Sequence, residues 1–152
     1  MEDVKVPTLD EIKDYLTGYG WKYRETTGGV GQVVLIAPCA LANENKGVLL
    51  SFRIEGEFVM VSTVGFLKNI SPNYSKRLLE LNDKIKLVKL YVSHQNNPEM
   101  MDVDLGFELW SEAWNKGSFY SFMDMVAEGI EVVLEVTKTE NIAHETDFVI
   151  FE

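Results

Sequence analysis

The most regular pattern of apolar and polar positions lies between residues 118 and 138. The polar positions are separated by gaps of 3, 4, 3, 4 and 3 residues, which places them in one stripe along an α-helix. This polar stripe covers only roughly 100° of the helix circumference, so most of the helix surface is apolar. An ordinary surface helix has the reverse arrangement, with a narrow apolar stripe and a wide polar face. We therefore predict a long helix, capped by Ser118, with more apolar surface than one sheet face covers. Its polar positions are Ser121, Asp124, Glu128, Glu131, Glu135 and Lys138.

The rest of the pattern predicts two more helices and six strands. One helix begins at Thr8, where residues 8–11 have the form of a capping box, and another opens at Ser71 and Pro72. Alternating apolar and polar residues predict strands at residues 21–26, 33–37, 48–64 (a hairpin), 86–95 and 100–110. The order α-β-β-β-β-α-β-β-α predicts an α+β fold in which helices pack on an antiparallel sheet. We expect a single domain over residues 8–138, followed by a C-terminal tail at residues 139–152.

The alternation also predicts how the strands pair. In the first hairpin, a turn at Glu55-Gly56 pairs Phe52 with Val59. The core face of this hairpin then carries Leu50, Phe52, Val59 and Val61. The second hairpin opposes Val88, Leu90 and Val92 to Phe107, Leu105 and Val103. Its other face is expected to be exposed to solvent and to carry Lys89, Tyr91, Asp102, Asp104 and Glu108.

The excess apolar surface of the long helix predicts contact with a second subunit. Five helix positions are assigned to the sheet of the same chain: Phe119, Phe122, Val126, Ile130 and Val133. One flank, made by Met125, Val132 and Val136, borders the acidic stripe, which would form the polar rim of a two-fold interface. In the alternative, residues 148–151 of the tail fold back and cover this flank.

Trp110 and Trp114 stand in the segment that leads to the long helix, close to Phe119 and Tyr120. Such an aromatic cluster closes a core or anchors a binding partner. Core closure is the favoured reading, and both tryptophans are also candidates for the subunit interface.

Composition narrows the classes of partner. The formal net charge is −10, from 24 acidic and 14 basic residues. Because nucleic acids and anionic membranes bind surfaces rich in lysine and arginine, this charge makes both classes of partner unfavourable. No apolar run approaches about 18 residues, and the N-terminus lacks the features of a signal peptide. Cys39 is the single cysteine, which excludes an internal disulfide and fits a reducing compartment. We expect a cytoplasmic protein that binds neither nucleic acid nor membranes.

The short motifs favour structural roles. The run GGVG at residues 28–31 precedes a predicted strand, whereas a phosphate-binding loop requires a helix, so we predict a hairpin turn. Asp102 and Asp104 lie on one face of a strand, where a charge-paired, solvated surface is favoured over a cation site. The acidic stripe of the long helix is read as solvated, although a basic partner or a divalent ion would relieve its repulsion. Structural roles are also favoured for Cys39, His94 and His144. We expect no catalytic, cofactor-binding or metal-binding residues.

Five segments in this order resemble the YbjN family of bacterial sensory transduction regulators. They are GWKYRE (20–25), FVMVSTV (58–64), ISPNYSKRLLELND (70–83), the hairpin 87–110 and the long helix 118–136. The resemblance covers most of residues 9–137 and rests on element order and on the helix end LLELN (78–82). It implies a fold like that of type III secretion chaperones, and a dimeric, non-enzymatic regulatory or chaperone-like protein without active-site residues.

Two hypotheses remain open from the sequence. In the first, the protein is a homodimeric regulatory protein that presents sheet or helix surface to another protein. In the second, it binds a small molecule or a divalent ion in a pocket between the sheet and the long helix, lined by aromatic residues, Asp102 and Asp104. The sequence does not identify the partner, the pathway or the flank that forms an interface.

Overall fold

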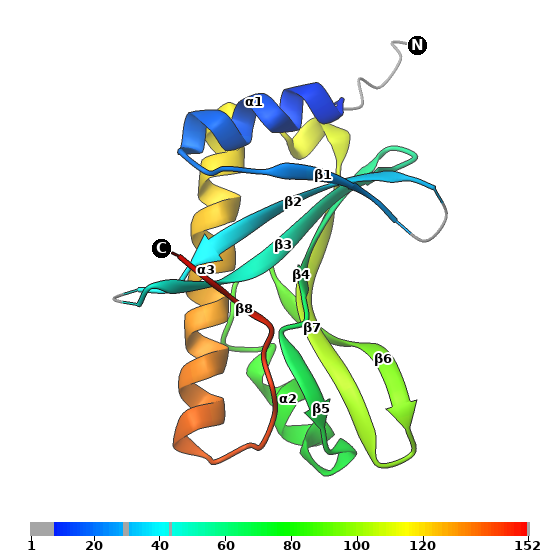
Figure 1. Ribbon diagram of the computed structural model, residues 1–152, viewed down its shortest axis with the longest axis vertical. Helices are drawn as coiled ribbons and strands as arrows, with labels where there is room; N and C mark the ends of the chain where they lie inside the picture. Colours follow the sequence, from blue (N-terminus) through cyan, green and yellow to red (C-terminus); the bar gives the residue numbers. More distant parts are fainter. Residues whose placement is uncertain (1–7, 29–30, 43, 152) are drawn as a thin grey trace.

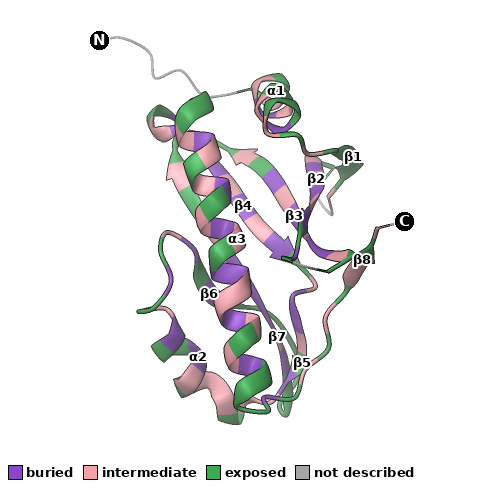
Figure 2. Ribbon diagram, turned by 90° about the vertical axis from the view of Figure 1, so that its left-hand side faces the viewer, coloured by how far each residue is buried: buried purple, intermediate pink, exposed green. Residues whose placement is uncertain are grey.

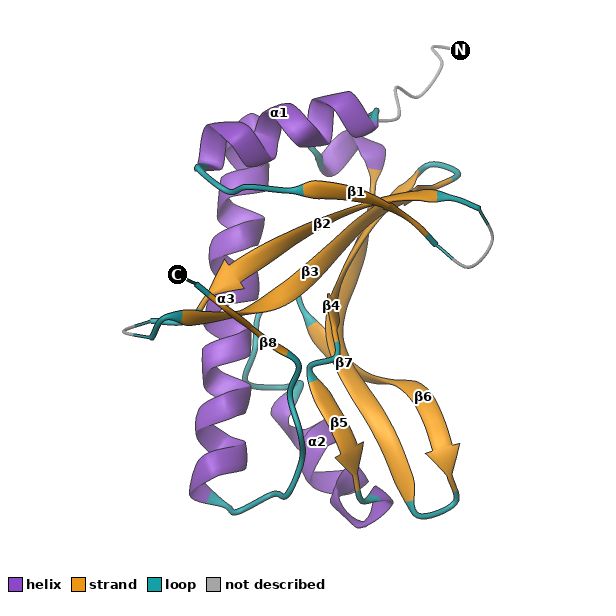
Figure 3. Ribbon diagram, in the orientation of Figure 1, coloured by secondary structure: helices purple, strands orange, loops and turns teal. Residues whose placement is uncertain are grey.

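The computed structural model describes residues 8–28, 31–42 and 44–151. Within these residues the protein has three α-helices packed on an eight-stranded antiparallel sheet, which confirms the predicted α+β fold (Figure 1, Figure 3). The helices are α1 (Leu9–Tyr19), α2 (Ser75–Leu81) and α3 (Lys116–Thr139). The 3-10 turns η1 (Pro72–Tyr74) and η2 (Ser111–Ala113) precede α2 and α3. The strands are β1 (Arg24–Thr27), β2 (Val33–Ala40), β3 (Lys46–Glu55), β4 (Phe58–Val64), β5 (Leu67–Ile70), β6 (Lys89–Asn97), β7 (Met100–Trp110) and β8 (Phe148–Ile150).

Two strands, β5 and β8, are additions to the predicted order, and both follow from a break in the sheet. The strand order is β1-β2-β3-β4-β7-β5, with β6 on the other side of β7. The chain leaves β4 after Val64 and continues as β5, so one edge of β7 pairs first with β4 and then with β5. This exit leaves the start of β3 unpaired on that side, and β8 fills the position by pairing Phe148 with Val48.

The hairpin of β3 and β4 has the predicted core face but a different register. Gly56 takes a φ of 57° and begins the turn, so that Glu55 pairs with Phe58 and Phe52 pairs with Val61. The predicted turn at Glu55-Gly56 was wrong: the two central residues are Gly56 and Glu57, and one class of two-residue hairpin turn takes glycine with positive φ at its first central position. The partners shift by two residues, and such a shift keeps each side chain on its face. Leu50, Phe52, Val59 and Val61 are all buried.

The hairpin of β6 and β7 has the predicted register near α2, where Leu90 pairs with Leu105 and Val92 with Val103. Beyond Val92 the pairing shifts at two irregularities. Val92 lies on the same face as the buried Leu90, yet it is 53% exposed. At Leu90 the outer edge of β6 is closed by Asn82, whose side chain accepts from Leu90 N at 2.7 Å and donates to Leu90 O at 3.3 Å.

Helix α3 runs along one face of the sheet and turns its exposed residues away from the strands (Figure 2). It begins after Asn115 rather than after Ser118. The Asn115 side chain accepts from Ser118 N and the Ser118 hydroxyl accepts from Asn115 N, both at 2.9 Å, which forms a capping box. Phe122 is half-buried, and the neighbouring Met123 is fully buried in the core. The other predicted core positions of the helix are buried: Phe119, Val126, Ile130 and Val133.

The C-terminal tail folds back on its own chain. Lys68 and Glu145 exchange backbone hydrogen bonds of 2.7 and 2.9 Å, and Phe151 N donates to Asn45 O at 2.7 Å. Between them, β8 pairs with β3. The tail thus packs against β5 and β3, and not on the Met125 flank of the long helix as in the predicted alternative. The division of the chain at residue 138 into domain and tail stays a prediction.

Candidate functional site: the open face of the sheet

The helices cover one face of the sheet and leave the other face open. Across β1, β2, β3, β4 and β7 the open face carries a row of neighbouring residues: Arg24, Ile36, Ser51, Ser62 and Gly106. Parallel rows place apolar side chains on both sides of this row, including Pro38 and Leu49 on one side and Met60 on the other. Four large apolar or aromatic side chains of the open face are 40–45% exposed: Phe58, Val64, Tyr91 and Trp110. In other proteins, contiguous exposed apolar surface is a common feature of interaction sites.

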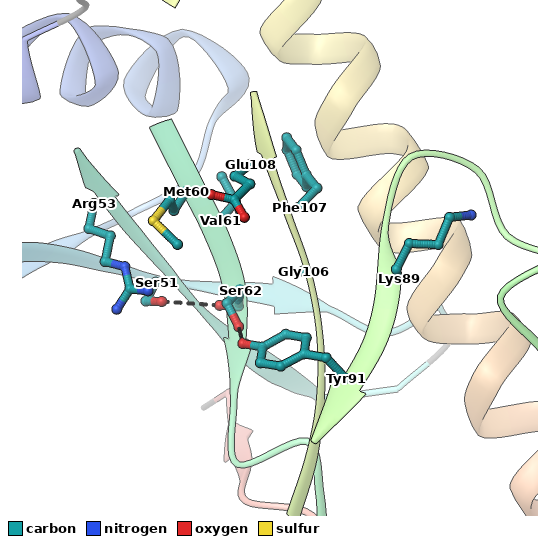
Figure 4. A pocket seen from close by; sticks show the side chains of 10 residues that line it. All are labelled: Ser51, Arg53, Met60, Val61, Ser62, Lys89, Tyr91, Gly106, Phe107 and Glu108. Atoms are coloured by element: carbon teal, nitrogen blue, oxygen red, sulfur yellow. Dashed lines mark hydrogen bonds between the residues drawn. The ribbon is translucent and has the colours of Figure 1, made fainter. Parts of the chain in front are cut away.

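The middle of the open face is hollowed to a volume of about 290 Å³, and we call this the central hollow (Figure 4). It exists because Ser51, Ser62 and Gly106, which are small, stand side by side on β3, β4 and β7. Longer side chains rise around them, namely Arg53, Met60, Tyr91 and Glu108.

The polar groups of the central hollow are bonded to one another. The hydroxyls of Ser62 and Tyr91 share a hydrogen bond, and Ser51 Oγ donates to Ser62 O at 3.3 Å. Burial raises the pKa of Tyr91, and although its hydrogen bond to Ser62 opposes this shift, the phenol stays protonated at neutral pH. Lys89 also lines the hollow, but its ammonium donates to Asn82 O and Ile85 O at 2.8 and 2.9 Å and points away (Figure 4).

Two other hollows have different linings. The edge hollow, of about 330 Å³, lies on the open face where β1, β2, β3 and β8 meet. It is lined by Lys22, Tyr23, Arg24, Ile36, Pro38, Leu49 and Val149. The α2 hollow, of about 130 Å³, lies between α2 and β6 and is almost wholly apolar. Leu79 and Val92, which are 67% and 53% exposed, form part of its wall.

The predicted subunit interface on α3 is less exposed than the sequence suggested. Met125, Val132 and Val136 are half-buried, and the two valines pack against the core. Gly129 lies on the same side of the helix, and a Cβ there would come within 2.6 Å of Val88 Cγ2. The flank therefore faces the segment before β6, which shields part of it. Its role in a dimer stays a prediction.

The opposite flank is covered within the chain as well. This flank is made by Met123, Ala127 and Leu134; Met123 is fully buried, and the other two pack against the core. Next to Met123, the Tyr19 hydroxyl of α1 donates to Asp124, and about two turns further along α3, Ala42 N donates to Glu131 Oε1 at 2.7 Å. Two members of the acidic stripe are thus hydrogen-bonded to the rest of the chain. Asp124 is nevertheless exposed, as the solvated reading of the stripe expects, whereas Glu131 is half-buried beside the loop after β2.

The structure separates the two candidate tryptophans. Trp114 is 6% exposed, stacks on Phe107 with ring centroids 5.8 Å apart and meets Phe122 edge-on at 5.2 Å. It closes the core and is not available to a partner, which corrects its candidacy for the interface. Trp110 is 43% exposed, and its Nε1 donates to Glu57 Oε2 at 3.1 Å. Trp110 lies beside Phe58 on the open face of the sheet, which α3 does not cover.

The two aspartates of β7 do not form the solvated, charge-paired surface that the sequence predicted. Asp104 is 7% exposed and fills the break between β4 and β5, where its carboxylate accepts from Thr63 Oγ1 at 2.7 Å and from Phe66 N at 3.1 Å. Its other oxygen accepts from Ser93 Oγ at 2.5 Å. The side chain replaces backbone bonds that the sheet loses there, which no local sequence signal shows.

Asp102 is half-buried and also holds the chain near the break. Its Oδ1 accepts from Asn69 N at 3.0 Å and from Asn96 Nδ2 at 2.9 Å. Burial by itself would raise the pKa of Asp102, but these two hydrogen bonds and the charge of Lys68 lower it below its usual value. The carboxylate is therefore ionised at neutral pH and is paired to its own chain.

The remaining motifs lie apart from one another. Gly29 and Val30 of the GGVG run are outside the described residues, and β1 and β2 pair as a hairpin on either side of it. Cys39 is buried on β2, and burial and the charge of Glu131 raise the pKa of its thiol to about 12. His94 is exposed on β6, and His144 lies in the tail with its Nδ1 2.8 Å from Ile142 O.

The space between the sheet and α3, where the sequence allowed a ligand pocket, is filled by side chains. Phe52, Phe119 and Ile130 are each 0% exposed there. Among the described residues, no group of three or more histidine, cysteine or acidic side chains is arranged to hold a metal ion. In the same part of the chain, no helix combines the length and apolar character needed to cross a membrane.

No protein-family model and no curated protein matches the sequence of this chain. The structure is similar to the crystal structure of YbjN from E. coli, described as a proposed transcription regulator, with a TM-score of 0.65 and 16% sequence identity. The match covers 92% of this chain and 98% of that chain. At this identity the similarity shows the fold, so the resemblance expected from the sequence is confirmed at that level: the chain has a YbjN-like fold.

Proposed function

We propose that this protein is a non-enzymatic regulatory protein that acts by binding another protein through the open face of its sheet. The observation that carries the proposal is the exposure of three aromatic side chains on the open face: Tyr91 lines the central hollow, and Phe58 and Trp110 are paired neighbours on β4 and β7. Exposed aromatic side chains are frequent anchors of protein interfaces. A regulatory role also agrees with the description of the structurally similar YbjN.

The chemistry of the central hollow supports a binding role over catalysis. A serine nucleophile requires a base of suitable pKa within hydrogen-bond distance. The partner of Ser62 is the Tyr91 phenol, whose raised pKa leaves it protonated at neutral pH and unable to take a proton. Ser51 is bonded to a backbone carbonyl instead. We therefore expect no intrinsic hydrolase, transferase or oxidoreductase activity.

Site-specific photocross-linking tests the proposed surface. A photoreactive phenylalanine analogue at Met60, on the open face, should give a cross-linked product with another protein in cells. The same analogue at the exposed Glu128 of α3 serves as the matched control and should not. Equal products from both positions, or a product from Glu128 alone, would contradict the open face as the binding surface.

We also propose a homodimer that uses the Met125, Val132 and Val136 flank. The flank borders the acidic stripe and is half-buried, so a second copy would complete its cover. The double variant Met125→Lys with Val132→Lys should be a folded monomer by light scattering and near-ultraviolet circular dichroism. A dimer that persists in this variant would refute the flank, and loss of folding would mean that it packs only within its own chain.

A further inference from the structure

The edge hollow differs from the rest of the surface in charge, and this difference indicates the chemistry of the partner. We infer that the edge hollow docks an acidic, amphipathic segment of a partner protein. The inference rests on the proposed function and adds to it where on the open face the partner sits and what side chains it brings.

The floor of the edge hollow is apolar and is assembled from three strands. Pro38 and Leu49 are paired neighbours on β2 and β3, Ile36 lies two residues along β2, and Val149 enters from β8. All four are half-buried, so each retains apolar surface that a partner can cover. A volume of about 330 Å³ is at the lower end of the range for binding pockets and suits one or two partner side chains.

The rim of the edge hollow is cationic. Lys22 and Arg24 are both exposed, and within the described residues neither forms an ion pair with an acidic side chain. No acidic residue lines the hollow, although the chain has 24 acidic residues against 14 basic ones. A hollow with two unpaired cations and no acid is therefore the opposite of the average surface of this protein, and it favours a partner with carboxylates beside its apolar side chains.

The central hollow and the α2 hollow do not favour an acidic partner in this way. The lining of the central hollow includes both an acidic residue, Glu108, and a basic one, Arg53. Its second basic residue, Lys89, directs its ammonium to backbone carbonyls outside the hollow. The α2 hollow has no charged residue in its lining. A nucleic acid is a poor fit to the edge hollow, because binding of phosphates requires more neutralising contacts than two cations supply on a chain of net charge −10.

The test uses the full chain and two synthetic fluorescein-labelled peptides in fluorescence anisotropy. Both peptides are amphipathic helices with leucines on one face, and the other face carries glutamates in one peptide and lysines in the other. The glutamate peptide should bind at least about tenfold tighter than the lysine peptide, and added salt should weaken its binding. Methyl resonances of Ile36, Leu49 and Val149 should shift on titration with the glutamate peptide.

Charge variants locate the site. Lys22→Glu with Arg24→Glu should weaken the glutamate peptide by about tenfold or more, because two attractions become repulsions. The matched control has the same change in net charge at a distant site: Lys76→Glu with Lys84→Glu, both exposed and near α2 (Figure 1). This control should keep the affinity within about twofold.

Four results would overturn the inference: no binding of the glutamate peptide, equal binding of both peptides, equal loss in both charge variants, or methyl shifts confined to Leu79 and Val92 of the α2 hollow. Tighter binding of a labelled DNA duplex than of the glutamate peptide would also overturn it and would favour a nucleic-acid partner. These failures are separable from failure of the proposed function, because cross-linking from Met60 reports a partner on the open face whatever its charge.

Discussion

The two faces of the sheet are built from the same strands, yet they obey different constraints. On β3, Leu50 and Phe52 point to the helices and are 0% exposed, whereas Ser51 and Arg53 alternate with them on the open face. On the covered face, the volume of each side chain is constrained, because the side chains there are closely packed and a change in volume disturbs their neighbours. The open face carries the small residues Ser51, Ser62 and Gly106 side by side, and exposed aromatic side chains lie on the same face. We therefore place the proposed binding surface on the face that the helices leave uncovered.

The two tryptophans test this comparison most strongly, because the same substitution is made on each face. Trp114→Ala should lower the free energy of unfolding by about 3–5 kcal/mol, since it empties a buried position among Phe107 and Phe122. Trp110→Ala should change it by less than about 1 kcal/mol, because the ring is 43% exposed. Urea denaturation followed by circular dichroism measures both values. Similar losses would mean that the open face is also part of the folded core.

The two aspartates of β7 allow a buried and a half-buried side chain to be compared at the break in the sheet. Asp104→Ala should cost about 1–3 kcal/mol, because the buried Thr63 hydroxyl and the Phe66 N–H lose their acceptor. Asp102→Ala should cost less, since water can reach its half-buried partners. The same urea experiment serves here, and a larger loss for Asp102→Ala would contradict the structural role assigned to Asp104.

The stability of the protein at alkaline pH tests the hydrogen bond by which Tyr19 of α1 is joined to Asp124 of α3. Burial first, and then the Asp124 carboxylate, raise the pKa of Tyr19 from 10.0 to about 12. The unfolded chain loses this proton near pH 10, whereas the folded chain keeps it until about pH 12. Over that interval the folded state binds more protons, so the free energy of unfolding should fall as pH rises. Tyr19→Phe and Asp124→Asn should each make this fall shallower, and an unchanged slope in both would show that the bond does not act in solution.

The smallest effect is expected on the open face itself. Arg53 Nε lies 3.6 Å from Glu55 Oε1, and both side chains are about half exposed. Exposed ion pairs contribute little because water and salt screen them, so Arg53→Gln should alter the free energy of unfolding by less than about 0.5 kcal/mol. Thermal unfolding at low and high salt gives the measurement. A change above about 1 kcal/mol would place Arg53 among the residues that hold the fold.

The fold was largely predictable because it is expressed in local periodicity. The spacing of polar residues in the long helix, and the alternation in β3, β4 and β7, were sufficient to predict whether each segment is a helix or a strand and which of its residues face the core. Period-two alternation does not distinguish registers that differ by two residues, so the pairing of Phe52 came out wrong while its face was right. Val92 alternates in step with the buried Leu90 but is 53% exposed, because burial depends on the tertiary packing over a strand and not on its alternation alone.

The candidate site was much less predictable. The edge hollow joins residues 22–24, 36–38, 49 and 149, which no spacing in the sequence relates. Asp104 looked like a surface residue because its partners Thr63 and Phe66 are 41 and 38 residues away along the chain. The excess apolar surface of α3 was a real signal, but its shielding by the segment before β6 and by α1 arises only in the folded chain.

The bond between Asn82 and the two backbone groups of Leu90 has a consequence for the protein at high concentration. An unpaired strand edge is a template on which further copies can add and grow into aggregates. Beside this edge lie Leu79 and Val92, two exposed aliphatic side chains that would strengthen such a stack. The Asn82 amide occupies the position that a neighbouring strand would take, and the irregular pairing beyond Val92 makes the remaining edge a poor template. One short polar side chain thus helps to determine how long a concentrated solution of this protein stays clear.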